Sequence, residues 1–189
     1  MSDSRYYIPE GKEVRIAISG RSGCGNTTVS RMLAEILDIS FINYTFRALA
    51  TEMRIPLEQI LENAKNDFSY DRMVDEKQVE LARQASCVLG SRLAIWMLPE
   101  ANIKVYLEAS EETRARRIFN REGGSQEEII EFTKMRDAED TRRYKELYKI
   151  DNADYTFADI IIDTEKSLPK TIVEKIILEL KKRGLVVRE

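Results

Sequence analysis

The feature that most constrains this chain is a short glycine-rich segment that lies between two apolar patterns. Residues 20–28 read Gly-Arg-Ser-Gly-Cys-Gly-Asn-Thr-Thr, after the apolar run Val14–Ile18 and at the start of the amphipathic stretch Thr28–Leu37. A loop with the spacing Gly-x-x-x-x-Gly-Lys-Ser/Thr, placed after a strand and before a helix, is typical of a phosphate-binding loop. Its backbone N–H groups surround phosphate oxygens. The segment therefore predicts a parallel α/β fold that holds a nucleoside triphosphate.

One position of the loop departs from this pattern. Gly20, Gly25 and Thr27 match it, whereas Asn26 occupies the place of the lysine. A charged donor to the β- and γ-phosphates is worth roughly 1.5–3 kcal/mol, and a neutral amide is worth about 1 kcal/mol. We therefore expect nucleotide binding to survive and turnover to fall, unless an arginine such as Arg21 supplies the charge. The alternative is a glycine-rich turn between strand and helix that binds no ligand.

The composition is typical of one compact domain, because 43% of the 189 residues are hydrophobic and 33% are charged. The net charge of −3 argues against a large basic surface for nucleic acid. The sequence has no apolar run of the roughly 20 residues that span a membrane and no secretory signal, so we expect a cytoplasmic protein without a membrane partner. With 2 cysteines and no histidine, the chain offers neither a disulfide framework nor histidine-based catalysis.

Short β-rich runs alternate with helical patterns along the chain. The runs are Val14–Ser19, Ile39–Ile42, Cys87–Leu89, Ile103–Leu107 and Asp159–Ile162. Between them, residues 45–85 read as a helical region with turn signals near Pro56, and a last helix is expected over Lys170–Lys182. Strands that alternate with helices indicate a parallel sheet that is covered on both faces.

Arginines recur on two predicted helix faces. The sets are Arg114, Arg117 and Arg121, spaced i, i+3, i+7, and Arg136, Asp140 and Arg143, spaced i, i+4, i+7. The second set lies in line with Ile129 and Leu147, which predicts a face turned toward a cleft. Arg47 and Arg92 follow the second and third strands, where ligands of open parallel sheets bind. For both helix faces, the alternative is a solvated row of ion pairs.

Several motifs beyond the loop point to one family. They are Gly20–Thr28, Tyr44–Arg47, Asp71-Arg72 with Asp75, Gln78–Ala82, Ser91–Trp96, Arg114–Ile118 with Arg121-Glu122, Arg136-Asp137 with Asp140, and Arg143-Tyr144 with Tyr148 and Asp151. With these motifs the chain resembles the short-type cytidylate kinases, which are P-loop nucleoside monophosphate kinases. The resemblance extends from about Glu13 to Leu180.

The resemblance implies a single α/β domain with the P-loop kinase fold, in which helices flank a five-stranded parallel sheet. Its core would comprise residues 13–43, 86–113 and 156–183. A helical insert at 44–85 would bind the nucleoside monophosphate, and a short lid would lie at 114–143. The implied reaction is phosphoryl transfer from ATP, with Mg²⁺, to CMP or dCMP.

The same resemblance assigns roles to individual residues. ATP would be bound by Gly20, Arg21, Ser22, Gly23, Cys24, Gly25, Asn26, Thr27, Thr28, Arg117 and Arg121, with the Thr27 hydroxyl on Mg²⁺. The acceptor would be bound by Arg47, Arg92, Arg136, Asp140 and Arg143. Catalysis would fall to Asn26, Arg117, Arg136 and Arg143. The Cys24 thiol is either reactive at its helix N-terminus or a small residue that fits the loop.

A second departure lies at Gly90, near which many members of the family carry an acidic residue that helps to hold hydrated Mg²⁺. Gly90 and Asn26 both belong to the expected catalytic centre. Two other hypotheses therefore stay open beside the cytidylate kinase. One is a nucleotide-binding sensor that has lost phosphoryl transfer, and the other is a kinase for a different small acceptor. The sequence leaves the oligomeric state undetermined.

Overall fold

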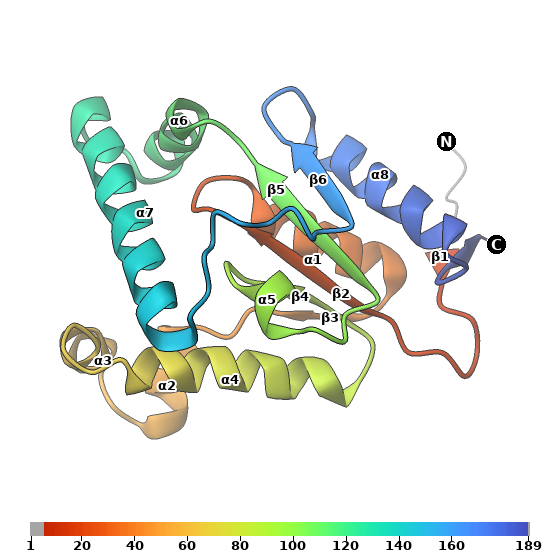
Figure 1. Cartoon of the computed structure of the whole chain (residues 1–189), viewed down its shortest axis with the longest axis horizontal. Helices are drawn as coiled ribbons and strands as arrows, with labels where there is room; N and C mark the ends of the chain where they lie inside the picture. The colour runs from red at the N-terminus through yellow and green to blue at the C-terminus, as the bar shows by residue number, and fades with distance from the viewer. Residues whose placement is uncertain (1–5, 189) are drawn as a thin grey trace.

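A five-stranded parallel sheet with helices on both faces forms the centre of the molecule (Figure 1). The computed structural model describes residues 6–188. The strands lie in the order β3-β4-β2-β5-β6. Their bounds are Arg15–Gly20 for β2, Ser40–Ile42 for β3, Cys87–Gly90 for β4, Ile103–Glu108 for β5 and Ile160–Asp163 for β6. The predicted parallel sheet is confirmed, and each strand begins and ends within one residue of its expected bounds.

Helices cover the two faces because successive side chains of β2 point in opposite directions. Ile16 and Ile18 pack into a cluster with α1 (Asn26–Leu37) and α8 (Pro169–Lys182). Ala17, on the opposite face, packs into a second cluster with α4 (Ser69–Gln84) and α5 (Ala94–Met97). A strand buried on both faces reads as a continuous apolar run, which is the pattern that predicted β2.

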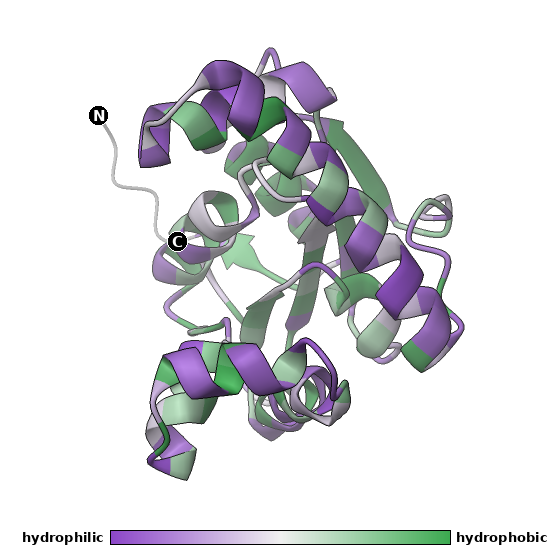
Figure 2. Cartoon of the chain, turned by 90° about the vertical axis from the view of Figure 1, so that its left-hand side faces the viewer, coloured by the Kyte–Doolittle hydropathy of each residue, from purple (hydrophilic) through white to green (hydrophobic). Residues whose placement is uncertain are grey.

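Two helical excursions extend beyond the sheet. The first comprises α2 (Phe46–Met53), α3 (Leu57–Ala64) and α4, and it has an apolar cluster of its own around Leu49, Ile60 and Val74. The second comprises α6 (Glu111–Glu122) and α7 (Gln126–Tyr148). Figure 2 shows green strands in the interior and largely purple helices around them. Within residues 6–188, no helix has both the length and the apolar composition needed to cross a bilayer.

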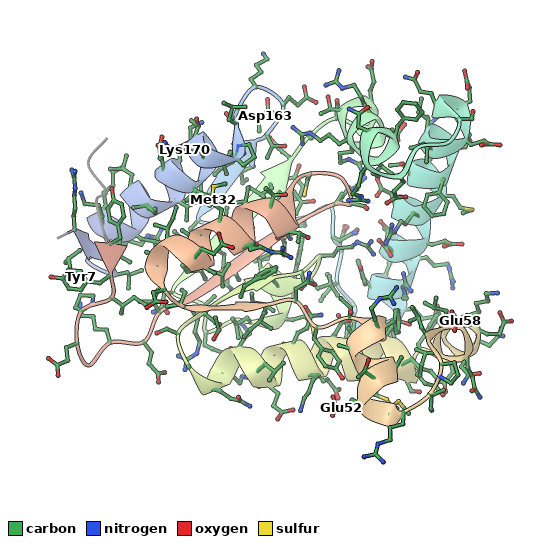
Figure 3. All side chains as sticks on the ribbon, turned by 180° about the vertical axis from the view of Figure 1, so that it is seen from behind. Tyr7, Met32, Glu52, Glu58, Asp163 and Lys170 are labelled. Carbon is green, nitrogen blue, oxygen red and sulfur yellow. The ribbon has the colours of Figure 1, made fainter. Side chains whose placement is uncertain are left out.

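A two-stranded antiparallel sheet joins the two ends of the described chain. β1 (Tyr6–Tyr7) pairs with β7 (Val187–Arg188), and Lys12 Nζ donates to the Gly184 oxygen at 3.1 Å. Tyr7 lies at the end of the molecule opposite α7 (Figure 3). The sequence pattern does not predict these two strands, because two-residue strands are too short to show a period.

Candidate active site

A cleft of about 920 Å³ lies at the carboxyl ends of the central strands. Its walls include the glycine-rich loop (20–29), the start of the first helical excursion (43–46), the segment after β6 (164–169) and side chains of α4, α6 and α7. In Figure 3, the label Asp163 marks the end of β6, which precedes the lining segment 164–169, and the label Glu58 marks α3 in the first group of helices outside the sheet. Ligands of open parallel sheets bind at such a place. Distant segments of the sequence therefore meet where the loop predicts a nucleotide.

The loop has the backbone shape that phosphate binding needs. Gly23 and Gly25 have φ angles of 84° and 95°, which residues with a Cβ rarely adopt. Gly25 is the N-cap of α1, so the positive end of the helix dipole faces the loop. Thr27 and Thr28 lie in the first turn of α1 and place their side chains at the cleft. All of the predicted phosphate-binding positions from 20 to 28 line the cleft.

The loop also lies too close to α6 for a side chain at Gly23. A Cβ added there would be 2.7 Å from the backbone oxygen of Arg114. We expect G23A to weaken ADP binding at least about tenfold, measured by calorimetry, because the loop would have to move away from α6. Gly11 is the matched control, since it has a φ of 78° and no atom within 4 Å of an added Cβ. If G23A bound ADP as tightly as G11A, the close packing of the loop would not matter for binding.

Asn26 lines the cleft, but the polar atoms of its side chain are engaged by neighbouring protein groups. Its Nδ2 donates to the backbone oxygens of Ile18 at 2.9 Å and Ser91 at 3.2 Å. Its Oδ1 accepts a hydrogen bond of 2.8 Å from Ser30 Oγ. An asparagine amide has two N–H donors, and both have partners here. The expected neutral hydrogen bond from Asn26 to the β- and γ-phosphates is therefore not available in this structure.

A buried ion pair holds α6 against the outside of the loop. Arg114 Nη2 lies 2.7 Å from Asp137 Oδ2, and the Arg114 side chain is 3% exposed. Arg114 Nη1 also donates to the backbone oxygen of Ser22 at 3.1 Å. The helical spacing predicts Arg114 on the arginine face and indicates no separate role for it. In the structure it anchors the loop and does not face the cleft.

Two other arginines near the loop point in different directions. Arg21 Nη1 lies 3.3 Å from Asp137 Oδ2, so the Arg21 charge is directed at α7 and not at the interior of the loop. Arg117 lines the cleft and donates to the Thr164 hydroxyl at 2.9 Å and to the Thr164 backbone oxygen at 2.6 Å. Arg117 Nη1 also lies 3.4 Å from the Cys24 backbone oxygen. Arg117 thus joins α6, the loop and the end of β6.

On the opposite side of the cleft, two arginines share a buried carboxylate. Arg92 Nη1 is 2.9 Å from Asp140 Oδ2, and Arg143 Nη2 is 2.5 Å from Asp140 Oδ1. Arg143 Nη1 also lies 2.9 Å from Asp71 Oδ1 on α4. Asp140 is 4% exposed. The cost of burying its charge is offset because each of its two oxygens is paired with an arginine. The arrangement presents Arg92 and Arg143 to the cleft, with Asp140 outside its lining.

Not every expected acceptor or lid residue reaches the cleft. Arg47 is exposed on α2, and Arg136 is half-buried on α7. Neither of them lines the cleft. Arg121 does line it, and its guanidinium is paired with the neighbouring Glu122. The structure therefore brings Arg92, Arg117, Arg121 and Arg143 to one cavity and leaves Arg47 and Arg136 outside it.

Other lining residues had received no role from the sequence. Asp71, Asp75 and Gln78 line the cleft from α4, and their i, i+4, i+7 spacing was a readable signal that they share a helix face. Thr164 and Lys166 line it from the segment after β6. The rule that ligands lie beyond the carboxyl ends of strands, applied to β6 as it was to β4, would have found this segment.

Asp75 makes the stability of the protein depend on pH. Burial raises the pKa of Asp75 to about 6, and the charge of Asp71 raises this pKa further. The hydrogen bond from Tyr148 and the charges of Arg143 and Arg92 act in the opposite direction and lower it. The unfolded carboxyl titrates near 3.9. Because the pKa is higher in the folded state, protonation of Asp75 contributes to the free energy of unfolding. This contribution is fully present below the unfolded pKa and is lost as the pH rises through about 6.

We expect D75N to raise the free energy of unfolding at pH 8 by about 1 kcal/mol and to flatten its decline between about pH 4 and 6, measured by urea unfolding. Burial also raises the pKa of Asp71, so the decline is reduced and not abolished. E76Q, which changes an exposed carboxylate on the same helix, is the control and should follow the wild-type profile. A D75N profile parallel to that of wild type would contradict the assignment.

Cys24 is 2% exposed beneath the loop. Burial raises the pKa of its thiol to about 11, despite the nearby Arg114 and Arg117. A thiol that stays protonated is a poor nucleophile. Of the two readings of Cys24, the structure favours the small residue that fits under the loop.

The geometry agrees with the comparisons with known proteins. The model of the cytidylate kinase-like family matches residues 15–166 of this chain. The chain belongs to this family. Cytidylate kinase 2 of Borreliella burgdorferi is 43% identical over 176 residues, which are 91% of this chain and 98% of that protein. The cytidylate kinase of Methanocaldococcus jannaschii is 36% identical over 157 residues, which are 80% of this chain and 88% of that protein.

Solved structures show the same fold as this cytidylate kinase-like protein. Shikimate kinase from Acinetobacter baumannii, in complex with shikimate, has a TM-score of 0.62 at 22% identity and covers 92% of this chain and 96% of its own. Deoxyadenosine kinase from M. mycoides with bound dATP has a TM-score of 0.54 at 18% identity, covering 88% and 98%. The predicted P-loop kinase fold is confirmed. The cytidylate kinase-like protein is thus a phosphotransferase of the nucleoside monophosphate kinase class.

Proposed function

We propose that this protein transfers the γ-phosphoryl group of ATP to CMP or dCMP, giving ADP and CDP or dCDP. The observation that carries the proposal is one cleft that joins the phosphate-binding loop to Arg92 and Arg143, in a chain whose relatives are named cytidylate kinases. The loop suits the donor polyphosphate, because its N–H groups and the N-terminus of α1 attract anions. The arginines across the cleft suit the phosphate of the acceptor.

The reaction would need positioning and positive charge more than covalent chemistry. An oxygen of the acceptor phosphate attacks the γ-phosphorus, a new P–O bond forms, and the bond to the β-phosphate oxygen breaks as ADP leaves. No general base is needed, because the attacking oxygen is already anionic. The absence of histidine from the chain is therefore compatible with the mechanism.

Each arginine would have its own part in this reaction. Arg92 and Arg47 would hold the acceptor phosphate, while Asp140 would face the acceptor nucleotide. Arg143 and Arg136 would bridge the two phosphate groups. The lid arginines Arg117 and Arg121 would cover the donor. Because Arg47 and Arg136 lie outside the cleft here, the proposal includes a closing movement of the insert (44–85) and the lid (114–143), which would also exclude water.

Mg²⁺ fits the residues of this site. Within the described part of the chain, no cluster of three or more His, Cys, Asp and Glu side chains could hold a metal ion. Mg²⁺ does not need such a cluster, since it keeps several waters and binds substrate phosphates. The Thr27 hydroxyl, which lines the cleft, would be its protein ligand. With ATP bound, the ion would neutralise charge on the β- and γ-phosphates.

The proposal is tested by offering Mg·ATP with CMP, dCMP, UMP, AMP and GMP in one coupled assay of ADP release. We expect CMP and dCMP to be phosphorylated at about 1–100 s⁻¹, as in ordinary kinases, and the others much more slowly. A faster rate with another acceptor would contradict the proposed specificity. Tight ADP binding without transfer to any acceptor would instead identify a nucleotide-binding protein that has lost catalysis.

A further inference from the structure

Three positions meet behind the loop, at the point where β2 and β4 end. Asn26 and Ser30 lie one turn apart on α1 and are joined by the 2.8 Å hydrogen bond between Ser30 Oγ and Asn26 Oδ1. Ser30 is fully buried. Gly90, the last residue of β4, packs directly on it, because a Cβ added to Gly90 would lie 2.6 Å from Ser30 Oγ and 2.9 Å from Ser30 Cβ. Position 90 therefore has no room for a side chain while Ser30 is in place.

Asn26 completes a junction between the two strands. The backbone N–H of Ser91, just after β4, donates to the oxygen of Ile18 on β2 at 3.2 Å. Asn26 Nδ2 then donates to that same Ile18 oxygen and to the oxygen of Ser91. One side chain thus ties the start of α1 to both strands from which the cleft opens. We call Asn26, Ser30 and Gly90 the Asn26 bracket.

We propose that Asn26 is a positioning residue and not a phosphate ligand. The Asn26 bracket fixes the loop and the Ser91-Arg92 segment relative to each other, and groups other than residue 26, among them the arginines of the cleft, supply the positive charge around the phosphates. The part that concerns transfer depends on the function proposed above, whereas the part that concerns the loop and nucleotide binding does not. Asn26 and Gly90, which depart separately from the family pattern in the sequence, belong to one neutral arrangement.

A lysine at position 26 would not fit this arrangement. If its ammonium group took the place of the amide, it would lie among backbone oxygens and the Ser30 hydroxyl without a carboxylate, since Gly90 carries none. If it reached into the cleft, the Ser91 oxygen, the buried Ile18 oxygen and the buried Ser30 hydroxyl would each lose a partner, which is unfavourable. We therefore expect N26K to disturb the loop and not to restore a missing catalytic charge.

The test compares wild type with N26K, N26A, S30A and N26A/S30A. For each variant, ADP affinity is measured by calorimetry, kcat and KM for ATP by the coupled assay, and stability by urea unfolding. We expect N26K to weaken ADP binding and to lower kcat, each about tenfold. S30A should change both in the same direction although Ser30 is buried behind the loop, and the double variant should be only slightly worse than N26A. T133A, which removes a buried hydroxyl on α7, should combine additively with N26A.

Other results would contradict the positioning role of Asn26. A rise of about tenfold in kcat for N26K, or tighter ADP binding by N26K at unchanged stability, would show that position 26 acts on the phosphates and would overturn the proposal. Additive effects of N26A and S30A would also overturn it. If wild type phosphorylates no acceptor, the proposed function fails, but the ADP affinities of N26K and S30A still decide the positioning role. S30A removes a single hydroxyl, so its result stands even if N26K does not fold.

Discussion

Replacing Arg143 with alanine is expected to lower kcat/KM for transfer from Mg·ATP to CMP about 10³-fold. Arg143 lines the cleft and is held by Asp140 and Asp71, so its guanidinium is fixed where the proposed function needs charge between the two phosphate groups. Removing one positioned donor to a transition state costs on the order of 10²–10³ in rate, and arginines of phosphoryl-transfer enzymes contribute more. The measurement is steady-state kinetics with both substrates varied.

The neighbouring Arg142 provides a matched control. It lies on the same helix, its side chain is 66% exposed, and it pairs with Glu146 at 3.2 Å. R142A should keep wild-type kinetics, and R143A should bind ADP within about threefold of wild type because the loop is unchanged. R143K keeps the charge but not the two-pronged geometry, so it should recover only a small part of the loss. An R143A enzyme within tenfold of wild type would mean that Arg143 merely ties α7 to α4.

The largest effect on stability is expected at Asp137. D137N should lower the free energy of unfolding by about 3 kcal/mol, because it leaves the buried Arg114 guanidinium without its carboxylate. Arg114 Nε already has no hydrogen-bond partner among the described residues, so the remaining contacts cannot replace the lost one. Urea unfolding of D137N is compared with that of E139Q, which changes an exposed carboxylate on the same helix and should match wild type.

A double variant separates the charge from the packing at this place. R114M/D137L removes both partners, so no buried charge is left alone and most of the stability should return. Its ADP affinity should stay below that of wild type, since the Ser22 oxygen loses the hydrogen bond from Arg114. A loss below about 1 kcal/mol in D137N would contradict the argument, because it would mean that the ion pair behaves as a solvated one.

The sheet could be predicted from the sequence because its signal is local. The apolar run at Ile16–Ile18 and the amphipathic stretch Thr28–Leu37 each occur within one element. Ile16–Ile18 is buried, as are Val29, Leu33 and Leu37 of the stretch, whereas Met32 is partly buried and Ile36 is exposed. The loop was predictable for the same reason, since its glycines follow a fixed spacing. The pairing of β1 with β7 was not, because its two partners are short and lie at opposite ends of the sequence.

The candidate site was predicted less completely because much of it depends on contacts between distant elements. Helical spacing indicated that Arg114 and Arg117 share a face, but not that Arg114 would meet Asp137 of the next helix. The residue type at Asn26 suggested a hydrogen-bond donor to phosphate, whereas the oxygens of Ile18 and Ser91 take both donors. In each case the partner is set by tertiary packing, which a pattern within one element does not specify.

The pairing of Tyr6 with Arg188 has a consequence for how the chain can be rearranged. Because the described ends lie side by side, far from α7 (Figure 1), a short peptide could join them with little strain, and the chain could be reopened elsewhere. The turn at Gly123-Gly124 has open space around both glycines and suits such an opening. In that circular permutant α6 would stay bound to the loop and α7 to α4, each now a free terminus. The turn would no longer join the two helices, and side-chain contacts such as the Arg114–Asp137 ion pair would hold them together, so the kinetics of the permutant would reveal whether catalysis requires the covalent turn.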